Sequence, residues 1–570
     1  MLCLLLATLL AGCGGIPNNS SPQPLNSFER QGPTEAVPSP QADMDPEALV
    51  RAFLKAAAAP ANAHVAARRF LTPSSARQWD ERGDTIVLDA INTFVDQRSQ
   101  NAVRMRLVGD NVGVLKSDGV LTPATGQVET TLSLVRVRDQ WRIDGPLPDG
   151  VMVDKAQFEA GYRPVSLYFT DRDRQHLVAD PRWLYAGRDS DATTLVNKLI
   201  DGPSTDLEPA VDSALPTGAG LRGPVTAISG GGVRIELTGL AALPVRDRNT
   251  LAAQIIWTLD GADIAGPYEI TADGAPLVPE RAAGWRTTDV KSFDPAAVPA
   301  TDVGLNIIRD GALLKVTDSG TTPSGGPLGT GRDLRSASIA PDGSRVAAAV
   351  ARPGPNAGLA LVTAPYGGAP TTVTSGPTIT RPSFGADADT VWAVVDGRPV
   401  QWIRDAESGA VRTLTVDAAQ IGRVVGGPIT EMQVAPDGVR VAMIVSGQVV
   451  FAVVATNEDG QVSLVNPRIA AYNIGNRAVS LDWASPTLLV IARDAADSPV
   501  VQLSINGTPA VGLLSGNVAP PVRALVANTS TIYIGDQRGV LRLGSTDGQP
   551  DEYWTEVEPA MAPGVIPVLP

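Results

Sequence analysis

IAPDGSRVAAAV at residues 339–350 and VAPDGVRVAMIV at residues 434–445 are two copies of one pattern, and they decide the fold of the C-terminal half of this 570-residue chain. In each copy an apolar stretch leads into Asp-Gly, a sequence that favours a tight hairpin turn, and a second apolar strand follows. Weaker copies lie at 384–395, 483–491 and 526–534. The copies recur every 42 to 50 residues or so, roughly the length of a four-stranded propeller blade.

These copies predict a ring of blades. Five copies, together with a strand around 305–316, predict six blades whose first and last strands are shared to close the ring, although seven blades stay possible. A two-sheet sandwich is the competing all-β arrangement, and the near-constant spacing disfavours it. We therefore predict a β-propeller at 296–560, followed by a short tail at 561–570.

An α+β domain is predicted at 45–160. Asp45-Pro46 is a helix start, with Asp as the N-cap and Pro in the first turn, and a second helical stretch covers 64–71. Farther on, apolar residues alternate at 103–107 and at 128–134, and 135–143 is typical of a hairpin that turns near Asp139-Gln140. Helices followed by an antiparallel meander predict helices on one face of a curved sheet, an order that resembles NTF2-like folds.

Residues 161–295 form a third predicted unit with the element order βαββαββ. Short motifs in this unit resemble the GerMN domain, which occurs in spore-germination proteins and in actinobacterial lipoproteins. The motifs that carry this resemblance are Leu167-Tyr168-Phe169, Leu177-Val178, Pro181-Arg182, Gly202-Pro203, Leu215-Pro216 and Ala253-Gln254-Ile255-Ile256-Trp257-Thr258.

The N-terminus resembles a bacterial lipoprotein signal. An apolar run at 2–11 is too short to span a bilayer, and Leu10-Ala11-Gly12-Cys13 resembles a lipobox. This resemblance implies that residues 1–12 are a signal peptide and that Cys13 becomes an N-palmitoyl, S-diacylglycerol cysteine. No Lys or Arg precedes the run, so either the start lies upstream or the positive segment is bare. Residues 13–44 are then the lipidated cysteine and a Pro-rich tether.

The composition excludes several kinds of partner. The net charge of −14 disfavours nucleic acid and repels anionic headgroups, so we expect membrane attachment through the lipid. Cys3 and Cys13 are the two cysteines, so a chain processed at Cys13 would have no disulfide.

No catalytic, cofactor or metal site is predicted. The two histidines, His64 and His176, lack the companions that a zinc site or a catalytic triad needs. The stretch at 218–223 matches G-x-G-x-x-G, but Pro216 precedes it and a β-like run follows, so it is a loop and not a dinucleotide site.

The order of these parts resembles that of the LpqB family of actinobacterial lipoproteins: a lipobox, a tether, an α+β domain, a GerMN-like domain and a propeller. The resemblance implies a regulatory, non-enzymatic protein on the extracytoplasmic face of the cell membrane. Its implied partner is the extracytoplasmic domain of an MtrB-like sensor histidine kinase in the MtrA–MtrB two-component system, with effects on the cell envelope and division.

Two other functions compete with this one. A wall glycan- or peptidoglycan-binding module is the main alternative, and it could use Trp392, Trp402 and Trp483 to stack on sugars, although these rings are expected in the core. A hydrolase is disfavoured because the chain lacks a nucleophile elbow and well-placed histidines.

Overall fold

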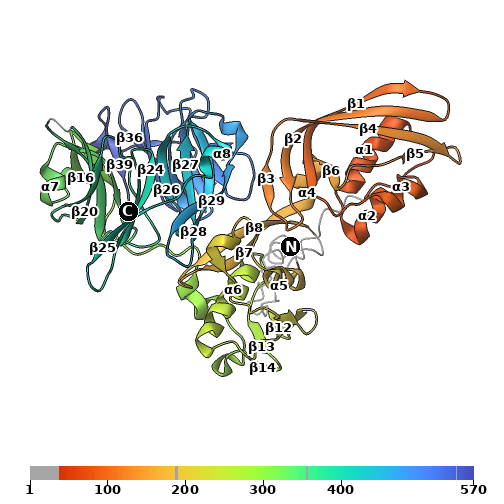
Figure 1. Ribbon diagram of the computed structural model, residues 1–570, viewed down its shortest axis with the longest axis horizontal. Helices are drawn as coiled ribbons and strands as arrows, with labels where there is room; N and C mark the ends of the chain where they lie inside the picture. The colour runs from red at the N-terminus through yellow and green to blue at the C-terminus, as the bar shows by residue number, and fades with distance from the viewer. Residues whose placement is uncertain (1–36, 187–190, 355–356, 547–548) are drawn as a thin grey trace, which may run out of the picture.

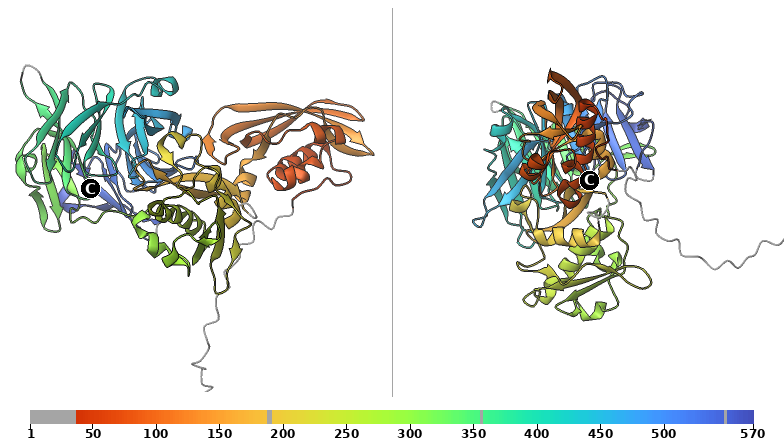
Figure 2. Two further views of the ribbon diagram at one scale, coloured as in Figure 1. Left: turned by 60° about the horizontal axis from the view of Figure 1, so that its bottom comes forward. Right: turned by 90° about the vertical axis from the view of Figure 1, so that its right-hand side faces the viewer.

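The computed structural model describes residues 37–186, 191–354, 357–546 and 549–570. They form three bodies (Figure 1): the N-terminal domain and the propeller lie at the two ends of the long axis, and the second domain lies below the place where they meet. Seen along the long axis, the N-terminal domain and the propeller lie one behind the other (Figure 2, right). Cys13 and most of the predicted tether fall outside the described residues.

The N-terminal domain has the predicted α+β arrangement. Its sheet has the order β5-β4-β2-β1-β6 with β3 beside β2, and buried side chains of the helices pack on one face of it. Asp45 caps the first helix by accepting hydrogen bonds from the amides of Glu47 and Ala48. The elements are α1 (Pro46–Ala57), α2 (Ala61–Arg68), α3 (Pro73–Gln78), β1 (Thr85–Arg98), β2 (Ala102–Leu115), β3 (Leu121–Pro123), β4 (Gln127–Val137), β5 (Gln140–Asp144) and β6 (Val151–Asp154).

Three details of this domain differ from the prediction. β6 pairs with β1 in parallel, so the sheet is not a pure meander. The β4–β5 hairpin turns at Arg138-Asp139, because Val137 pairs with Gln140. The helical stretch predicted at 64–71 overlaps α2, which ends at Arg68, and a further helix that was not predicted, α3, begins at Pro73.

The second domain contains two small sheets around α6, a helix that is buried on almost every side. One sheet has the order β8-β7-β9, and the other β10-β12-β13-β14 with β11 beside β12. The predicted order βαββαββ missed β8, which lies between β7 and α5, and the two short strands β9 and β10, which lie between α5 and β11. Helix α4 (Lys155–Gly161) leads into this domain, and its Phe158 packs in the core of the N-terminal domain. The elements of the second domain are β7 (Tyr162–Asp171), β8 (Leu177–Tyr185), α5 (Ala192–Asp201), β9 (Val211–Asp212), β10 (Gly220–Leu221), β11 (Thr226–Ala227), β12 (Val233–Thr238), α6 (Arg248–Asp260), β13 (Tyr268–Ala272) and β14 (Ala275–Pro276).

The described residues of the C-terminal half form six consecutive sheets, one for each predicted blade. The last strand, β39, pairs with β15 of the first blade and closes the ring. The predicted tail at 561–570 is therefore wrong as a separate segment, because it contains β39. The first three blades are β15 (Asn306–Arg309), β16 (Ala312–Thr317), β17 (Gly320–Pro323) with β39 (Ile566–Val568); β18 (Leu334–Ile339), β19 (Arg345–Arg352), β20 (Gly358–Pro365), β21 (Thr371–Gly376); and β22 (Ser383–Phe384), β23 (Thr390–Val395), β24 (Arg398–Arg404), β25 (Val411–Thr415).

The later blades follow the same plan, and two short helices, α7 (Gly326–Thr330) and α8 (Ile421–Val424), lie in connections between strands. The three remaining blades are β26 (Ile429–Val434), β27 (Arg440–Val445), β28 (Gln448–Thr456), β29 (Val462–Ile469); β30 (Ala478–Ser485), β31 (Leu488–Arg493), β32 (Val500–Ser504), β33 (Val511–Gly512); and β34 (Ala524–Ala527), β35 (Thr531–Gly535), β36 (Val540–Thr546), β37 (Gln549–Pro550), β38 (Thr555–Glu556).

The repeated Asp-Gly turns have one structure. The carboxylate of Asp342 accepts a hydrogen bond from the amide of Ser344 at 2.9 Å, and Asp437 accepts from Val439 at 3.0 Å. Asp387 makes the same contact with Asp389 at 2.8 Å in the weaker copy. The strand that follows is buried in each case, so one local pattern produces both the turn and the packing between blades.

Candidate functional site

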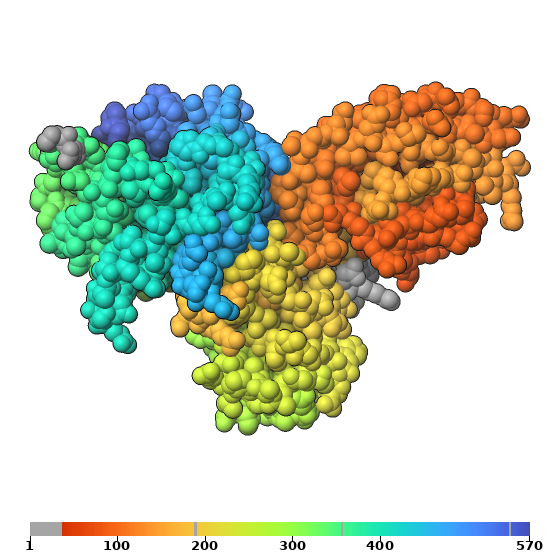
Figure 3. All heavy atoms as spheres, viewed as in Figure 1, coloured from red at the N-terminus to blue at the C-terminus, as the bar shows by residue number. Residues whose placement is uncertain are grey.

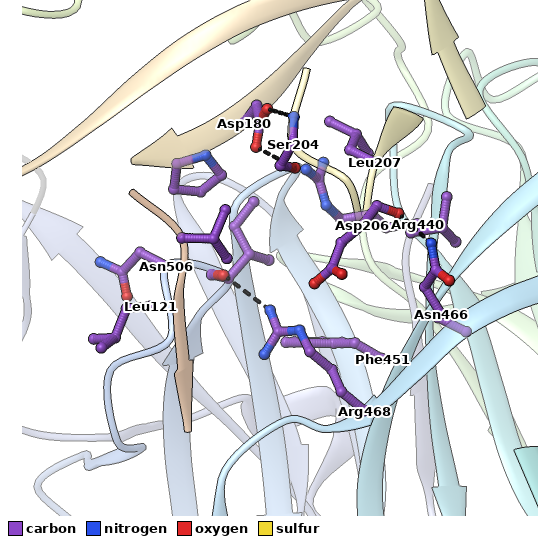
Figure 4. A pocket seen from close by; sticks show the side chains of 15 residues that line it. Leu121, Asp180, Ser204, Asp206, Leu207, Arg440, Phe451, Asn466, Arg468 and Asn506 are labelled. Atoms are coloured by element: carbon purple, nitrogen blue, oxygen red, sulfur yellow. Dashed lines mark hydrogen bonds between the residues drawn. The ribbon is translucent and has the colours of Figure 1, made fainter. Parts of the chain in front are cut away.

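The three domains meet at a single junction. The turn between β2 and β3, strand β8 of the second domain, strands of the fourth blade and a loop of the fifth blade converge there. The space-filling view shows the domains in contact (Figure 3). A cavity of about 50 Å³ lies between them (Figure 4). It is much smaller than the several hundred Å³ of an ordinary ligand site, so the junction holds domains together rather than binding a metabolite.

A buried ion pair fixes the N-terminal domain to the second domain. Asp180 and Arg182 of β8 are 2.6 Å apart, with side chains 2% and 3% exposed. Arg182 also donates to the carbonyl oxygen of Asp118 in the N-terminal domain at 2.6 Å. Asp180 accepts from the amide and the hydroxyl of Ser204 at 2.7 and 2.9 Å. Several partners offset the desolvation of each charge, although the Nε atom of Arg182 is buried without a hydrogen bond.

A second buried arginine fixes the second domain to the propeller. Arg440, the first residue of β27 in the fourth blade, pairs with Asp437 at 3.0 Å and donates to the carbonyl oxygen of Ala179 in β8. Two further contacts cross this boundary. Trp183 donates through its ring nitrogen to the carbonyl oxygen of Asn506 at 2.8 Å, and Asn466 donates to that of Asp206 at 2.8 Å.

The propeller also touches the N-terminal domain directly. Gly507 has a φ of +88°, and a Cβ atom built on it would lie 2.0 Å from the carbonyl oxygen of Leu121. Only glycine permits both this backbone conformation and this approach. The three domains are thus joined pairwise.

Arg468 lies at the wall of the cavity, as Figure 4 shows. Burial lowers its pKa to about 10, so it stays charged at neutral pH. Its guanidinium lies 5.4 Å from the ring centre of Phe451, and it donates to the carbonyl oxygen of Ile505 at 3.2 Å.

A larger cleft, of about 370 Å³, lies between the β7–β8 turn and the propeller. His176 lines it and contacts Asp171 at 3.1 Å. The hydrogen bond to Asp171 raises the pKa of His176, and Asp437 and Asp387 across the cleft add to the effect. A third cleft, of about 650 Å³, lies between the N-terminal sheet and propeller residues 471–473. Both clefts have the size of small-ligand sites.

The other histidine is structural. His64 is buried, its Nδ1 lies 2.9 Å from the carbonyl oxygen of Ala57, and its ring meets Trp79 edge-on at 5.9 Å. Burial lowers its pKa. It lies in the N-terminal domain, whereas His176 lies in the second domain, so the two do not form one site.

A charged network in the propeller joins Arg381, which lies just before β22, to Glu431 of β26 and Asp482 of β30. Arg381 is 2.7 Å from Glu431 and 3.6 Å from Asp482, so one cation faces two carboxylates. Burial raises the pKa of Asp482 to about 6. The network binds the third, fourth and fifth blades together, and it reaches the sixth because Asp482 also accepts from the amide of Ala527 at 3.1 Å.

The predicted site residues do not come together. Cys13, predicted to carry the lipid, lies outside the described residues, and its modification stays a prediction. The stretch at 218–223 holds the short strand β10 and leads into no helix. Within the described ranges no group of three or more His, Cys, Asp or Glu side chains is placed to hold a metal ion. The same ranges contain no helix that is long and apolar enough to cross a membrane.

The junction residues were missed by sequence reasoning. Arg182 lay within a GerMN-like motif, yet nothing marked it as buried, and Arg440 resembled an ordinary strand residue after a turn. The available signal was weak: Asp180-Pro181-Arg182 places two charges in a stretch with apolar neighbours on both sides.

Three family models match successive parts of the chain: an N-terminal domain of lipoprotein LpqB at 39–159, a sporulation and spore germination domain at 166–278, and a β-propeller domain of lipoprotein LpqB at 311–570. A Rhodococcus jostii protein described as lipoprotein LpqB is 37% identical, over 100% of this chain and 97% of the relative. Its Mycolicibacterium smegmatis counterpart is 40% identical, over 99% and 98%. The match to a chain of a solved nidogen/laminin complex covers 47% of this chain and 98% of the solved chain, at 12% identity and a TM-score of 0.32.

Proposed function

This chain belongs to the LpqB lipoprotein family, and from that premise we propose that it is a lipid-anchored, non-enzymatic regulator on the extracytoplasmic face of the cell membrane. Its partner in this proposal is the extracytoplasmic domain of an MtrB-like sensor histidine kinase. The anchor in this proposal is Cys13. Regulation requires that the protein bind one state of the kinase more tightly than another.

The observation that carries the proposal is the junction. Arg182 and Arg440 join the domains through buried hydrogen bonds, and these contacts hold the three domains together as the surface that the kinase would meet. Of the two histidines, His64 is buried against Trp79, and His176 is hydrogen-bonded to Asp171. In this proposal the three joined domains act by binding a protein rather than by turnover.

Binding between residues 45–570 and the kinase's extracytoplasmic domain tests the proposal. Every described helix and strand is retained in this chain. Deleting the propeller is a poor control, because it would expose Trp183 and leave Arg182 beside a new surface. The better control is the same chain unfolded by heat. Saturable binding by the folded chain is expected, and no saturation at the highest soluble concentration would refute the proposal.

A wall-ligand function is the second candidate, and the two interdomain clefts favour it because their volumes suit a sugar or short peptide. The tryptophans do not support stacking on sugars, since Trp392, Trp402 and Trp483 are 2%, 4% and 5% exposed. Saturable binding to purified wall fragments, without kinase binding, would favour this candidate.

A further inference from the structure

The free end of the N-terminal sheet is strongly basic. The two segments that form this end, 94–106 and 133–142, contain six arginines and two aspartates, a net charge of +4 in a chain whose total is −14. Strand pairing brings the segments together, because Ala102 pairs with Val135 and Arg136 pairs with Trp141. The arginines of this basic end are Arg98, Arg104, Arg106, Arg136, Arg138 and Arg142.

Half of these arginines form no ion pair among the described residues. Within the described residues, the side chains of Arg98, Arg104 and Arg138 are exposed and form no ion pair or hydrogen bond. By contrast, Arg106 lies 3.6 Å from Asp96 and is partly neutralised. Unpaired arginines gathered at one end produce a positive potential there, whereas the rest of the chain is negative.

Apolar side chains accompany the charges. Phe94, Val95 and Val137 are 47%, 49% and 37% exposed. Arginine beside exposed aromatic and aliphatic groups is the composition of surfaces that settle at a bilayer interface. Pairing with another strand is less suited to this end, because the ladder of β1 is interrupted between Val95 and Gln97 and the charged residue Asp96 lies in the bulge.

The position of the basic end fits a membrane. It belongs to the domain that directly follows the predicted tether, and it points away from the propeller (Figure 1). We propose that this end docks on an anionic phospholipid surface and so sets the orientation of the protein, with the propeller held away from the bilayer. A protein already attached by lipid has a high effective concentration at the surface, so modest affinity suffices. The proposal does not depend on kinase binding.

Vesicle sedimentation tests this proposal. The protein is residues 37–570, which contain every described element but neither Cys13 nor the apolar run before it. The probes are vesicles of phosphatidylcholine alone and of equal parts phosphatidylcholine and phosphatidylglycerol. We expect binding to the phosphatidylglycerol vesicles that weakens as salt is raised, and little binding to phosphatidylcholine.

Two matched variants test whether the basic end is the surface that binds the vesicles. Replacing Arg98, Arg104 and Arg138 with Glu should weaken binding by at least about tenfold, since each arginine near an anionic surface contributes on the order of fivefold. Replacing them with Gln should give a smaller loss. The control is the same change to Glu at three exposed propeller arginines, Arg332, Arg335 and Arg412, which should alter binding by less than about twofold by the same reasoning.

Circular dichroism of each variant establishes that it is folded. Equal binding by the basic-end variant and the wild type would overturn the proposal. So would equal losses in the basic-end and propeller variants, because net charge alone would then explain the effect. Failure of the wild type to bind phosphatidylglycerol vesicles would also overturn it, and would leave an acidic protein surface as the occupant of this end.

Discussion

Arg440 in the fourth blade donates a hydrogen bond to the carbonyl oxygen of Ala179, a residue 261 positions earlier in strand β8. Its other partner, Asp437, is 1% exposed and belongs to the Asp-Gly turn of the blade repeat. One side chain therefore connects the repeat that builds the propeller to the contact that positions the second domain.

Replacing Arg440 with Ala is expected to destabilise the protein by about 3 kcal/mol, because it leaves the buried carboxylate of Asp437 without its cation. Urea unfolding followed by tryptophan fluorescence measures this change. The control is Arg412→Ala on the exposed strand β25, which should cost less than about 0.5 kcal/mol. Equal effects at the two positions would mean that the Arg440 contacts contribute nothing of their own.

Replacing Gly507 with Ala should loosen the N-terminal domain from the propeller, because the new Cβ would overlap the carbonyl oxygen of Leu121. Gly460→Ala is the matched control: its φ is +76°, and a Cβ added there would meet nothing within 4 Å. Both variants carry a backbone cost of about 1 kcal/mol, and only Gly507→Ala adds a clash. Limited proteolysis between the domains should be faster in Gly507→Ala alone; equal rates in both variants would contradict the close approach.

The chain has two histidines, and their titrations should separate. Burial lowers the pKa of His64, and the contact with Asp171 raises that of His176, so NMR should place one imidazole below 6.5 and the other above it. The raised pKa of His176 means that its stabilising effect is present below pH 6.5 and lost as the pH rises through the folded-state pKa. His176→Gln should therefore lower stability at about pH 6 and have less effect at about pH 9. Two coincident titrations near 6.5 would contradict the geometry.

The stability that Asp482 contributes should fall as the pH rises, whereas an ordinary ion-paired carboxylate contributes more at higher pH. Its folded-state pKa of about 6 lies above the ordinary value of 3.8, so the folded protein holds this proton more tightly than the unfolded chain does. The contribution of Asp482 to the free energy of unfolding is fully present below pH 3.8 and is lost as the pH rises to about 6. The free energy of unfolding of Asp482→Asn, relative to wild type, should therefore increase between about pH 4 and pH 6, by about 1 to 3 kcal/mol. A difference that is flat across this range would show that Asp482 is ionised throughout.

The propeller was predictable because its signal is local and repeated. Asp342 and Asp437 each form their turn with residues two positions away, and the buried strand follows at once. The closing strand β39 was missed because its neighbourhood, GVIPVLP at 564–570, is short and rich in proline, which ordinarily weakens a strand.

Strand β8 and the junction were missed for another reason. Pro181 and the charges on either side of it hide the strand from an apolar pattern. Asp180 and Arg182 pair with each other, and their further partners, Ser204 and the carbonyl oxygen of Asp118, lie far away in the sequence. Asp118 and Arg182 meet only after the domains have packed, and no spacing in the chain encodes their meeting. The basic end could have been found from charge segregation, but its arginines are divided between two segments that strand pairing unites.

The regulator account is tested most directly by phosphorylation of the full-length kinase in vesicles. The lipidated protein is incorporated beside an MtrB-like kinase, and kinase autophosphorylation is measured as the amount of protein is increased. The account predicts a change in rate that saturates over the same concentration range as binding of residues 45–570 to the kinase's extracytoplasmic domain. An unchanged rate, together with no saturable binding, would contradict it.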